Sequence, residues 1–255
     1  MYAYNIMNTT LLSYLLLIGL STIGIYHNSV SFNPLRFHCN NYILSTYLYF
    51  ILGWAISLAT MSTIDEKQIS LGKLFTTKYT ILLSIISILL IISLSIIPAS
   101  WFVLKHFIFI LELIMIGVSL FPLYKIYKDR FNHVGLTTLL IILILSLIAF
   151  YRPTILSDNI GSSLLIGLLT IIIARLIEYS LFDYNNYKKS PYSRFINYAT
   201  IVLFSLYIIH DTKSIIRNSR TCSMSPYGPD FIIESIQLFL DSLNIFSSNL
   251  SLRSE

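Results

Sequence analysis

The sequence predicts an all-α protein, a polytopic transmembrane helical bundle, and three observations lead to this prediction. Of the 255 residues, 55% are hydrophobic and only 11% are charged, whereas a soluble domain carries about a quarter of its residues as charges. The mean hydropathy is +0.74. The apolar residues gather in runs long enough for a helix to cross a hydrocarbon core about 30 Å thick. These properties exclude a water-soluble globular fold and a disordered chain.

The apolar runs define the expected helices in order along the chain. Short connections separate them and leave no room for a soluble domain. Backbone polar groups in lipid must be satisfied within each segment, so each run is expected to form a helix of one bundle. The eight runs are Leu11–Tyr26, Tyr42–Ile64, Tyr79–Ile97, Trp101–Tyr124, Leu136–Tyr151, Ile160–Phe182, Phe195–His210 and Phe231–Leu250.

The basic residues between the runs predict how the helices are oriented. The first six connections alternate between one and three Lys or Arg residues, which is typical of loops on opposite sides of a membrane. We therefore expect the N-terminus and the even-numbered connections in the cytosol. In order, the basic residues are Arg36; Lys67, Lys73 and Lys78; Lys105; Lys125, Lys128 and Arg130; Arg152; and Lys188, Lys189 and Arg194.

The seventh connection breaks this alternation with Lys213, Arg217 and Arg220. Either the seventh or eighth run does not cross fully, or the short first run is not a span. The first run lacks the basic segment and the cleavage site of a secretory signal, so we expect an extra N-terminal helix there. An interfacial segment is the alternative.

Several functional classes are not expected. The net charge of +5 is dispersed along the chain, which argues against nucleic-acid binding. Cys39 and Cys222 give no disulfide framework and no metal-ligand cluster, and nothing indicates an organic cofactor. We also expect no enzyme, because the Gly-x-Ser-x-Gly and His-Glu-x-x-His motifs are absent, as is the Gly-x-Gly-Asp context of an intramembrane aspartyl protease.

Charged residues inside the runs are the first candidates for function. Inserting one charged side chain at the centre of a membrane helix costs about 2.5 to 3.5 kcal/mol, so each such residue requires a structural or functional explanation. Arg175 and Glu178 are three residues apart on one helix, where opposite charges can meet; they form a self-neutralising pair that lowers the insertion cost. Glu112 is a further charge within a run.

The last run carries a polar stripe. Its polar residues recur at steps of three, four, three and four, which places them on one side of a helix. Such a stripe should face the bundle interior or a wet cavity. The alternative is an amphipathic helix in the headgroup plane, but the stripe is acidic and lacks the Lys or Arg that such helices usually present. The five residues are Glu234, Gln237, Asp241, Asn244 and Ser248.

Asp241 has a natural partner in Asp211, which ends the preceding run. Two carboxylates within hydrogen-bond distance in a low-dielectric site cannot both ionise cheaply, so such a pair shares a proton and responds to pH. When both are deprotonated, they form an oxygen-rich site that attracts a hard cation such as calcium.

Around these two aspartates, the sequence resembles the C-terminal signature of the transmembrane Bax inhibitor motif family, which includes the lifeguard and Golgi anti-apoptotic proteins, some of them viral. The family pattern is an apolar helix ending in Asp-Thr, a short loop, and a helix reading roughly Asn-Leu-Tyr-Leu-Asp-x-x-Asn-Leu-Phe. Segments Tyr207–Lys213 and Pro229–Phe246 carry the likeness. Over the rest of the chain the resemblance is in hydropathy, with Glu112 placed like an acidic residue of the family's third core helix.

The resemblance implies a seven-helix Bax-inhibitor-like core over residues 42–255, preceded by an extra hydrophobic segment and loop over residues 1–41. It implies a calcium leak sensitive to pH through Asp211 and Asp241, with Glu234, Gln237 and Asn244 as a supporting polar stripe. The family is associated with suppression of cell death. The expected partners are the lipid bilayer, calcium ions, protons and apoptosis-related membrane proteins, and the expected location is the endoplasmic reticulum or Golgi if the source is eukaryotic or viral.

The chain also departs from the family pattern. Gln237 stands where the family favours Asn, His210 stands where Tyr is common, and Lys213 follows Asp-Thr. The alternative function is a non-conducting membrane protein that restrains cell death by binding partners.

Overall fold

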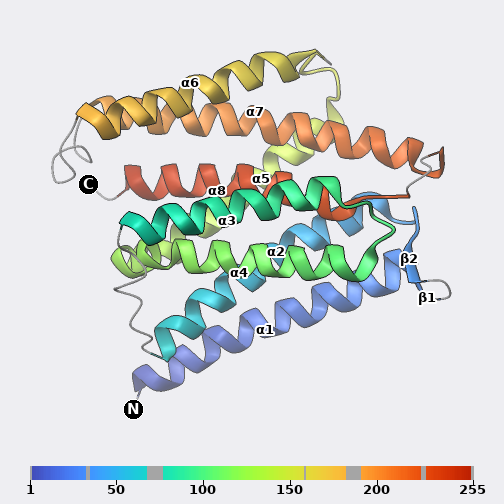
Figure 1. Ribbon diagram of the computed structural model, residues 1–255, viewed down its shortest axis with the longest axis horizontal. Coiled ribbons are helices and arrows are strands. Elements are labelled where there is room, and N and C mark those ends of the chain that lie inside the picture. Colours follow the sequence, from blue (N-terminus) through green and yellow to red (C-terminus); the bar gives the residue numbers. More distant parts are fainter. Residues whose placement is uncertain are drawn as a thin grey trace. The chain divides into compact units, whose positions relative to one another are not determined.

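The structure is a computed structural model that describes residues 2–32, 35–67, 77–157, 159–181, 191–224 and 228–253. Each of the eight predicted runs is a helix, so the polytopic helical bundle is confirmed (Figure 1). A short hairpin, which the sequence did not predict, joins the first two helices. The elements are α1 (Tyr2–Ser29), β1 (Val30–Phe32), β2 (Leu35–Phe37), α2 (Tyr42–Glu66), α3 (Thr77–Ile96), α4 (Phe102–Ile126), α5 (Lys128–Tyr151), α6 (Ile160–Leu181), α7 (Pro191–Thr221), the 3₁₀ turn η2 (Cys222–Met224) and α8 (Phe231–Leu252).

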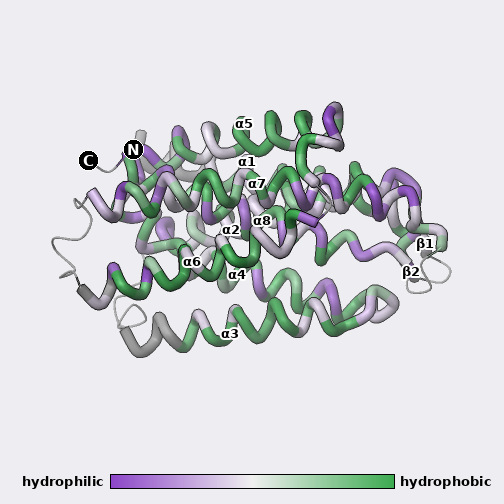
Figure 2. The backbone as a smooth tube through the Cα atoms, turned by 90° about the horizontal axis from the view of Figure 1, so that it is seen from above, coloured by the Kyte–Doolittle hydropathy of each residue, from purple (hydrophilic) through white to green (hydrophobic). Residues whose placement is uncertain are grey.

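The protein is an integral, multi-pass membrane protein. Among the described residues, six helices are long and apolar enough to cross a membrane: α1, α2, α4, α5, α6 and α7. Hydrophobic residues run along α3, α5 and α6 (Figure 2). Large apolar side chains on these helices are exposed, for example Leu139, Leu143 and Ile173. An exposed apolar surface of this extent is the surface that a protein presents to lipid.

The chain divides into two compact units. The first comprises residues Met1–Ile126 and Arg217–Ile236, and the second comprises Tyr127–Ile216 and Gln237–Glu255. In the first unit α2 and α4 pack closely: the Ser57 hydroxyl donates to the Leu113 carbonyl at 3.0 Å. In the second unit the rings of Phe131 and Phe246 join α5 to α8, with their centroids 4.8 Å apart.

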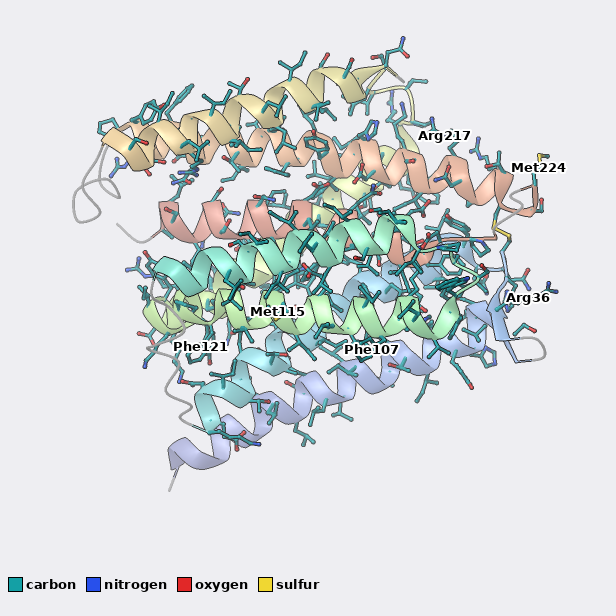
Figure 3. All side chains as sticks on the ribbon, viewed as in Figure 1. Arg36, Phe107, Met115, Phe121, Arg217 and Met224 are labelled. Atoms are coloured by element: carbon teal, nitrogen blue, oxygen red, sulfur yellow. A yellow bond between two sulfur atoms is a disulfide. The ribbon has the colours of Figure 1, made fainter. Side chains whose placement is uncertain are left out.

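The expectation about the cysteines was wrong. Cys39 and Cys222 form a disulfide across 183 positions of sequence. Figure 3 shows the bond in yellow near the segments that carry the labelled Arg36 and Met224. The two cysteines follow the β-hairpin and α7 respectively, and the first unit brings these two points together. Two cysteines so far apart in sequence give no local signal of pairing, because only the tertiary fold sets their distance.

Lys105, which the sequence analysis counted among the basic residues of the connections, is instead part of a helix. It lies in the first turn of α4 and is 0% exposed. Its ammonium group donates to the Asp230 carboxylate at 2.5 Å and to the Ile97 carbonyl at 2.7 Å. A buried cation needs partners of this kind, since an unpaired charge in the interior is very costly.

The basic residues that break the charge alternation belong to the end of α7. This helix has 31 residues, about 46 Å at 1.5 Å per residue, which exceeds the hydrocarbon core of about 30 Å. Lys213 donates to the Leu156 carbonyl at 2.6 Å. The length of α7 therefore lets its basic end extend beyond the apolar core. Lys73, Lys188 and Lys189 lie outside the described residues.

Candidate functional site: a carboxyl pair

The structure brings Asp211 and Asp241 together. Asp211 lies on α7 and Asp241 on α8, both within the second unit. Their carboxyl groups lie close enough to interact with each other. Asp241 is 7% exposed, and its Oδ2 has no hydrogen-bond partner in the part of the chain that the structure describes. Because a hydrogen bond between two carboxyl groups requires a proton on one of them, this contact is a place where a proton can be held.

Two further polar side chains surround the pair. The His210 Nδ1 lies 3.1 Å from the Asp211 Oδ1. The Tyr207 hydroxyl interacts electrostatically with both carboxyl groups. Arg175 directs its guanidinium to Glu178 and Asn197 rather than to the two aspartates.

The position of α8 explains why Asp241 is buried. This helix is covered on nearly all sides, so that apolar residues such as Leu238, Phe239 and Ile245 are completely or almost completely buried. The polar stripe follows the expected interior orientation at Glu234, Asp241 and Ser248, which are buried. Asn244 is half-buried and Gln237 is exposed. The stripe is therefore largely interior, with Gln237 as its exception.

Glu234 belongs to a different cluster from the aspartates. It lies in the first unit, where its carboxylate accepts hydrogen bonds from Tyr42 Oη at 2.7 Å and Asn218 Nδ2 at 2.7 Å. The Thr46 hydroxyl donates to it at 3.4 Å. These three donors satisfy the buried carboxylate and fix the start of α8 to α2 and to the end of α7. The sequence could not identify them, since Tyr, Thr and Asn in apolar runs have no distinctive spacing.

Glu112 is also separate from the pair. It is 0% exposed on α4, in the first unit, and accepts a hydrogen bond from the Ser87 hydroxyl of α3 at 2.5 Å. Its Oε2 has no hydrogen-bond partner among the described residues. The contact links α3 to α4.

Arg175 and Glu178 meet as their spacing predicted, with 2.9 Å between Nη1 and Oε2. Arg175 also donates to the Oδ1 of Asn197 on α7. The Nδ2 of Asn197 donates to the Ser251 hydroxyl of α8 at 3.2 Å. The pair is therefore part of a polar network that joins α6, α7 and α8.

The carboxyl pair offers a limited set of ligands for a metal ion. The described residues contain no group of three or more His, Cys, Asp and Glu side chains that could hold one. Calcium takes six to eight oxygen ligands, so Asp211 and Asp241 would leave most positions to water or carbonyl groups. The unpartnered Oδ2 of Asp241 is a suitable ligand atom. This chemistry fits weak binding of a partly hydrated ion.

Fold and site together define a multi-pass helical membrane protein in which a carboxyl pair joins two helices. The sequence model of the family described as "Inhibitor of apoptosis-promoting Bax1" matches residues 39–252, and the chain belongs to this family. The resemblance drawn from the two aspartate segments is therefore confirmed. Similar sequences include two uncharacterized proteins of Helicobacter pylori, from strains 26695 and J99, each 30% identical over 145 residues. The match covers 53% of this chain and 55% of each relative, so the chain spans about half the length of these relatives.

Proposed function

We propose that the protein is a pH-sensitive calcium leak channel of an internal membrane, the endoplasmic reticulum or Golgi if the source is eukaryotic or viral, that modulates calcium stores and suppresses apoptosis. The observation that carries the proposal is the interaction between the half-buried carboxyl group of Asp211 and the buried carboxyl group of Asp241. Family membership adds the link to inhibition of cell death, through the family's description.

The direction of gating follows from the chemistry of the pair. With one proton shared, Asp211 and Asp241 attract each other and hold α7 against α8. When the pH rises and the proton leaves, two negative charges face each other in a low-dielectric environment and repel. His210 and Tyr207 are the other titratable groups at the pair. Because the shared proton bridges the two helices, the leak should rise with pH.

Calcium flux in reconstituted vesicles tests this proposal. Purified protein is placed in liposomes loaded with a calcium dye, and the rate of calcium entry is measured from pH 5 to 8, a range chosen for the assay. We expect the wild-type rate to rise with pH. Asp211→Asn and Asp241→Asn should remove most of this dependence, because an amide paired with a carboxyl group cannot create two facing charges.

The matched control is Asp129→Asn, which changes an exposed acidic residue of the same unit and should leave the pH profile unchanged. If both aspartate variants leak like the wild type at every pH, the pair is not the sensor. If the wild type carries no calcium while protection of cells from death persists, the alternative of a non-conducting protein that binds partners replaces the channel.

A further inference from the structure

The second unit contains a cavity of about 530 Å³ that the proposed function does not use. It lies between α6, α7 and α8. Leucine and isoleucine side chains of α6 and the ring of Phe204 form its apolar walls. The space would hold more than ten water molecules at about 30 Å³ each. Its polar lining consists of Arg175, Glu178, Thr200, Asn244, Ser247 and Ser248.

One polar atom in this lining lacks a partner. Glu178 is 3% exposed, and its Oε1 has no hydrogen-bond partner among the described residues, although its Oε2 accepts from Arg175. Leaving a buried carboxylate oxygen without a partner is costly. A ligand or water that donates a hydrogen bond, or a cation, would remove that cost.

Three of the other polar groups each donate a proton to a helix backbone. The Thr200 hydroxyl donates to the Ile196 carbonyl at 2.7 Å, and the Asn244 amide donates to the Leu240 carbonyl at 2.8 Å. The Ser247 hydroxyl donates to the Asn244 carbonyl at 3.2 Å. Since these protons are committed to the helix backbones, the oxygen lone pairs remain for a ligand. Carboxylate, amide and hydroxyl oxygens are the ligands that hard cations prefer.

We propose that this cavity is a binding site for a hydrated cation on the path of the leak, with the Glu178 carboxylate as its charged ligand and Arg175 as the charge that limits its affinity. The inference rests on the proposed function for its physiological ion, calcium. Arg175 neutralises Glu178, so the site binds weakly. Weak binding suits conduction, because an ion must be able to leave again.

The place of the cavity along the helices connects it to the carboxyl pair. Asn244 is three residues beyond Asp241 on α8, about 4.5 Å along the axis. Thr200 lies 11 residues before Asp211 on α7, about 16 Å along the axis. The cavity thus begins about one helical turn from the carboxyl pair and extends toward the α6–α7 connection. The basic residues of that connection predict that it lies on the cytosolic side of the membrane. The cavity would serve as the vestibule on that side.

Calcium binding distinguishes this proposal from a purely structural ion pair. Equilibrium binding of radioactive calcium is measured on the full chain in neutral-lipid nanodiscs, in an Asp211→Asn, Asp241→Asn background that removes the other candidate site. Glu178→Gln should weaken binding about tenfold. Arg175→Gln should tighten it about tenfold, because it removes a positive charge beside the site. A structural pair would not respond in opposite directions.

Two further variants complete the experiment. Arg175→Gln combined with Glu178→Gln leaves no unpaired charge, which keeps the test valid if a single variant fails to fold. It should bind calcium more tightly than Glu178→Gln, which keeps the Arg175 charge, and more weakly than Arg175→Gln, which keeps the carboxylate. Asp129→Asn should bind like its background. Equal binding by all four variants would overturn the cavity site, even if vesicles leak normally. If calcium affinity in nanodiscs shifts in opposite directions for Glu178→Gln and Arg175→Gln, but vesicles with the wild-type protein do not leak calcium, the cavity site is kept and the channel is overturned.

Discussion

At the scale of single residues, the buried ion pair between Lys105 and Asp230 is a strong test of how charges stabilise this protein. Lys105 is 0% exposed, whereas the Asp230 side chain is 35% exposed. Removal of either partner leaves a charge behind, but only one of those charges is deeply buried. The two substitutions should therefore have unequal effects.

Asp230→Asn should destabilise the protein by about 3 to 5 kcal/mol, because it leaves the Lys105 ammonium group buried without a counter-charge. Asn at position 230 can still accept the hydrogen bond that Asp230 receives from the Ile233 N–H at 3.3 Å, so the start of α8 keeps its cap. Unfolding by SDS titration in mixed micelles, followed by circular dichroism, measures the change.

Lys105→Met is the matched control. It should cost less, since the remaining carboxylate of Asp230 reaches water, and the double variant should be more stable than Asp230→Asn alone. An Asp230→Asn protein that unfolds like the wild type would show that water already solvates the Lys105 ammonium group.

The candidate site was predictable at this scale only in part. Asp211 and Asp241 stood out because acidic residues are rare in apolar helices and these two match a family pattern. Arg175 and Glu178 were paired correctly because their contact is local. Asn197 was not identified, since its contacts with Arg175 and Ser251 depend on how three helices pack.

At the scale of elements, α2 and α4 approach each other closely at a glycine. A Cβ atom at Gly117 would lie 2.8 Å from the Ser57 carbonyl oxygen and 2.8 Å from the Thr60 Cβ. Both distances are below van der Waals contact, and one of the neighbours is backbone. Gly117 therefore permits the packing of these two helices, as small residues do in membrane bundles.

Gly117→Ala should destabilise the protein by about 1 to 3 kcal/mol, because the helices must move apart to accept the methyl group. Gly135→Ala is the control on α5, where the nearest atom to the new Cβ is Phe246 Cε2 at 3.8 Å. Alanine there should be neutral or stabilising by up to about 1 kcal/mol, through its higher helix propensity. SDS titration of both variants decides the point, and an equal effect at the two positions would contradict the close approach of α2 and α4.

At the scale of the whole molecule, hydropathy predicted all eight helices but not the contacts that fix their ends. Apolar length and burial in lipid determine a helix locally, so each run was visible in the sequence. The Cys39–Cys222 bond and the Lys105–Asp230 pair join positions that only the tertiary fold brings together. These are the features that the sequence could not predict.

The disulfide also makes a prediction about membrane topology. It requires the first and seventh connections to lie on the same side of the membrane. Disulfides persist in oxidising compartments, so this side should face away from the cytosol. The charge alternation predicts the same side for the odd-numbered connections. Two independent properties, redox chemistry and charge, therefore point to one orientation, despite the basic residues at the end of α7.

Thiol labelling in a bacterial host, whose periplasm is oxidising, tests this orientation. In intact cells, Cys39 and Cys222 should react with a membrane-impermeant maleimide only after an impermeant reductant has been added. The control replaces both cysteines with Ser and carries Asp129→Cys, at an exposed position in the first turn of α5. This new thiol should be labelled only after the membrane is permeabilised. If Asp129→Cys reacts in intact cells, and the native cysteines do not react there even after the reductant, the orientation is reversed. The cavity beside Glu178 would then open away from the cytosol.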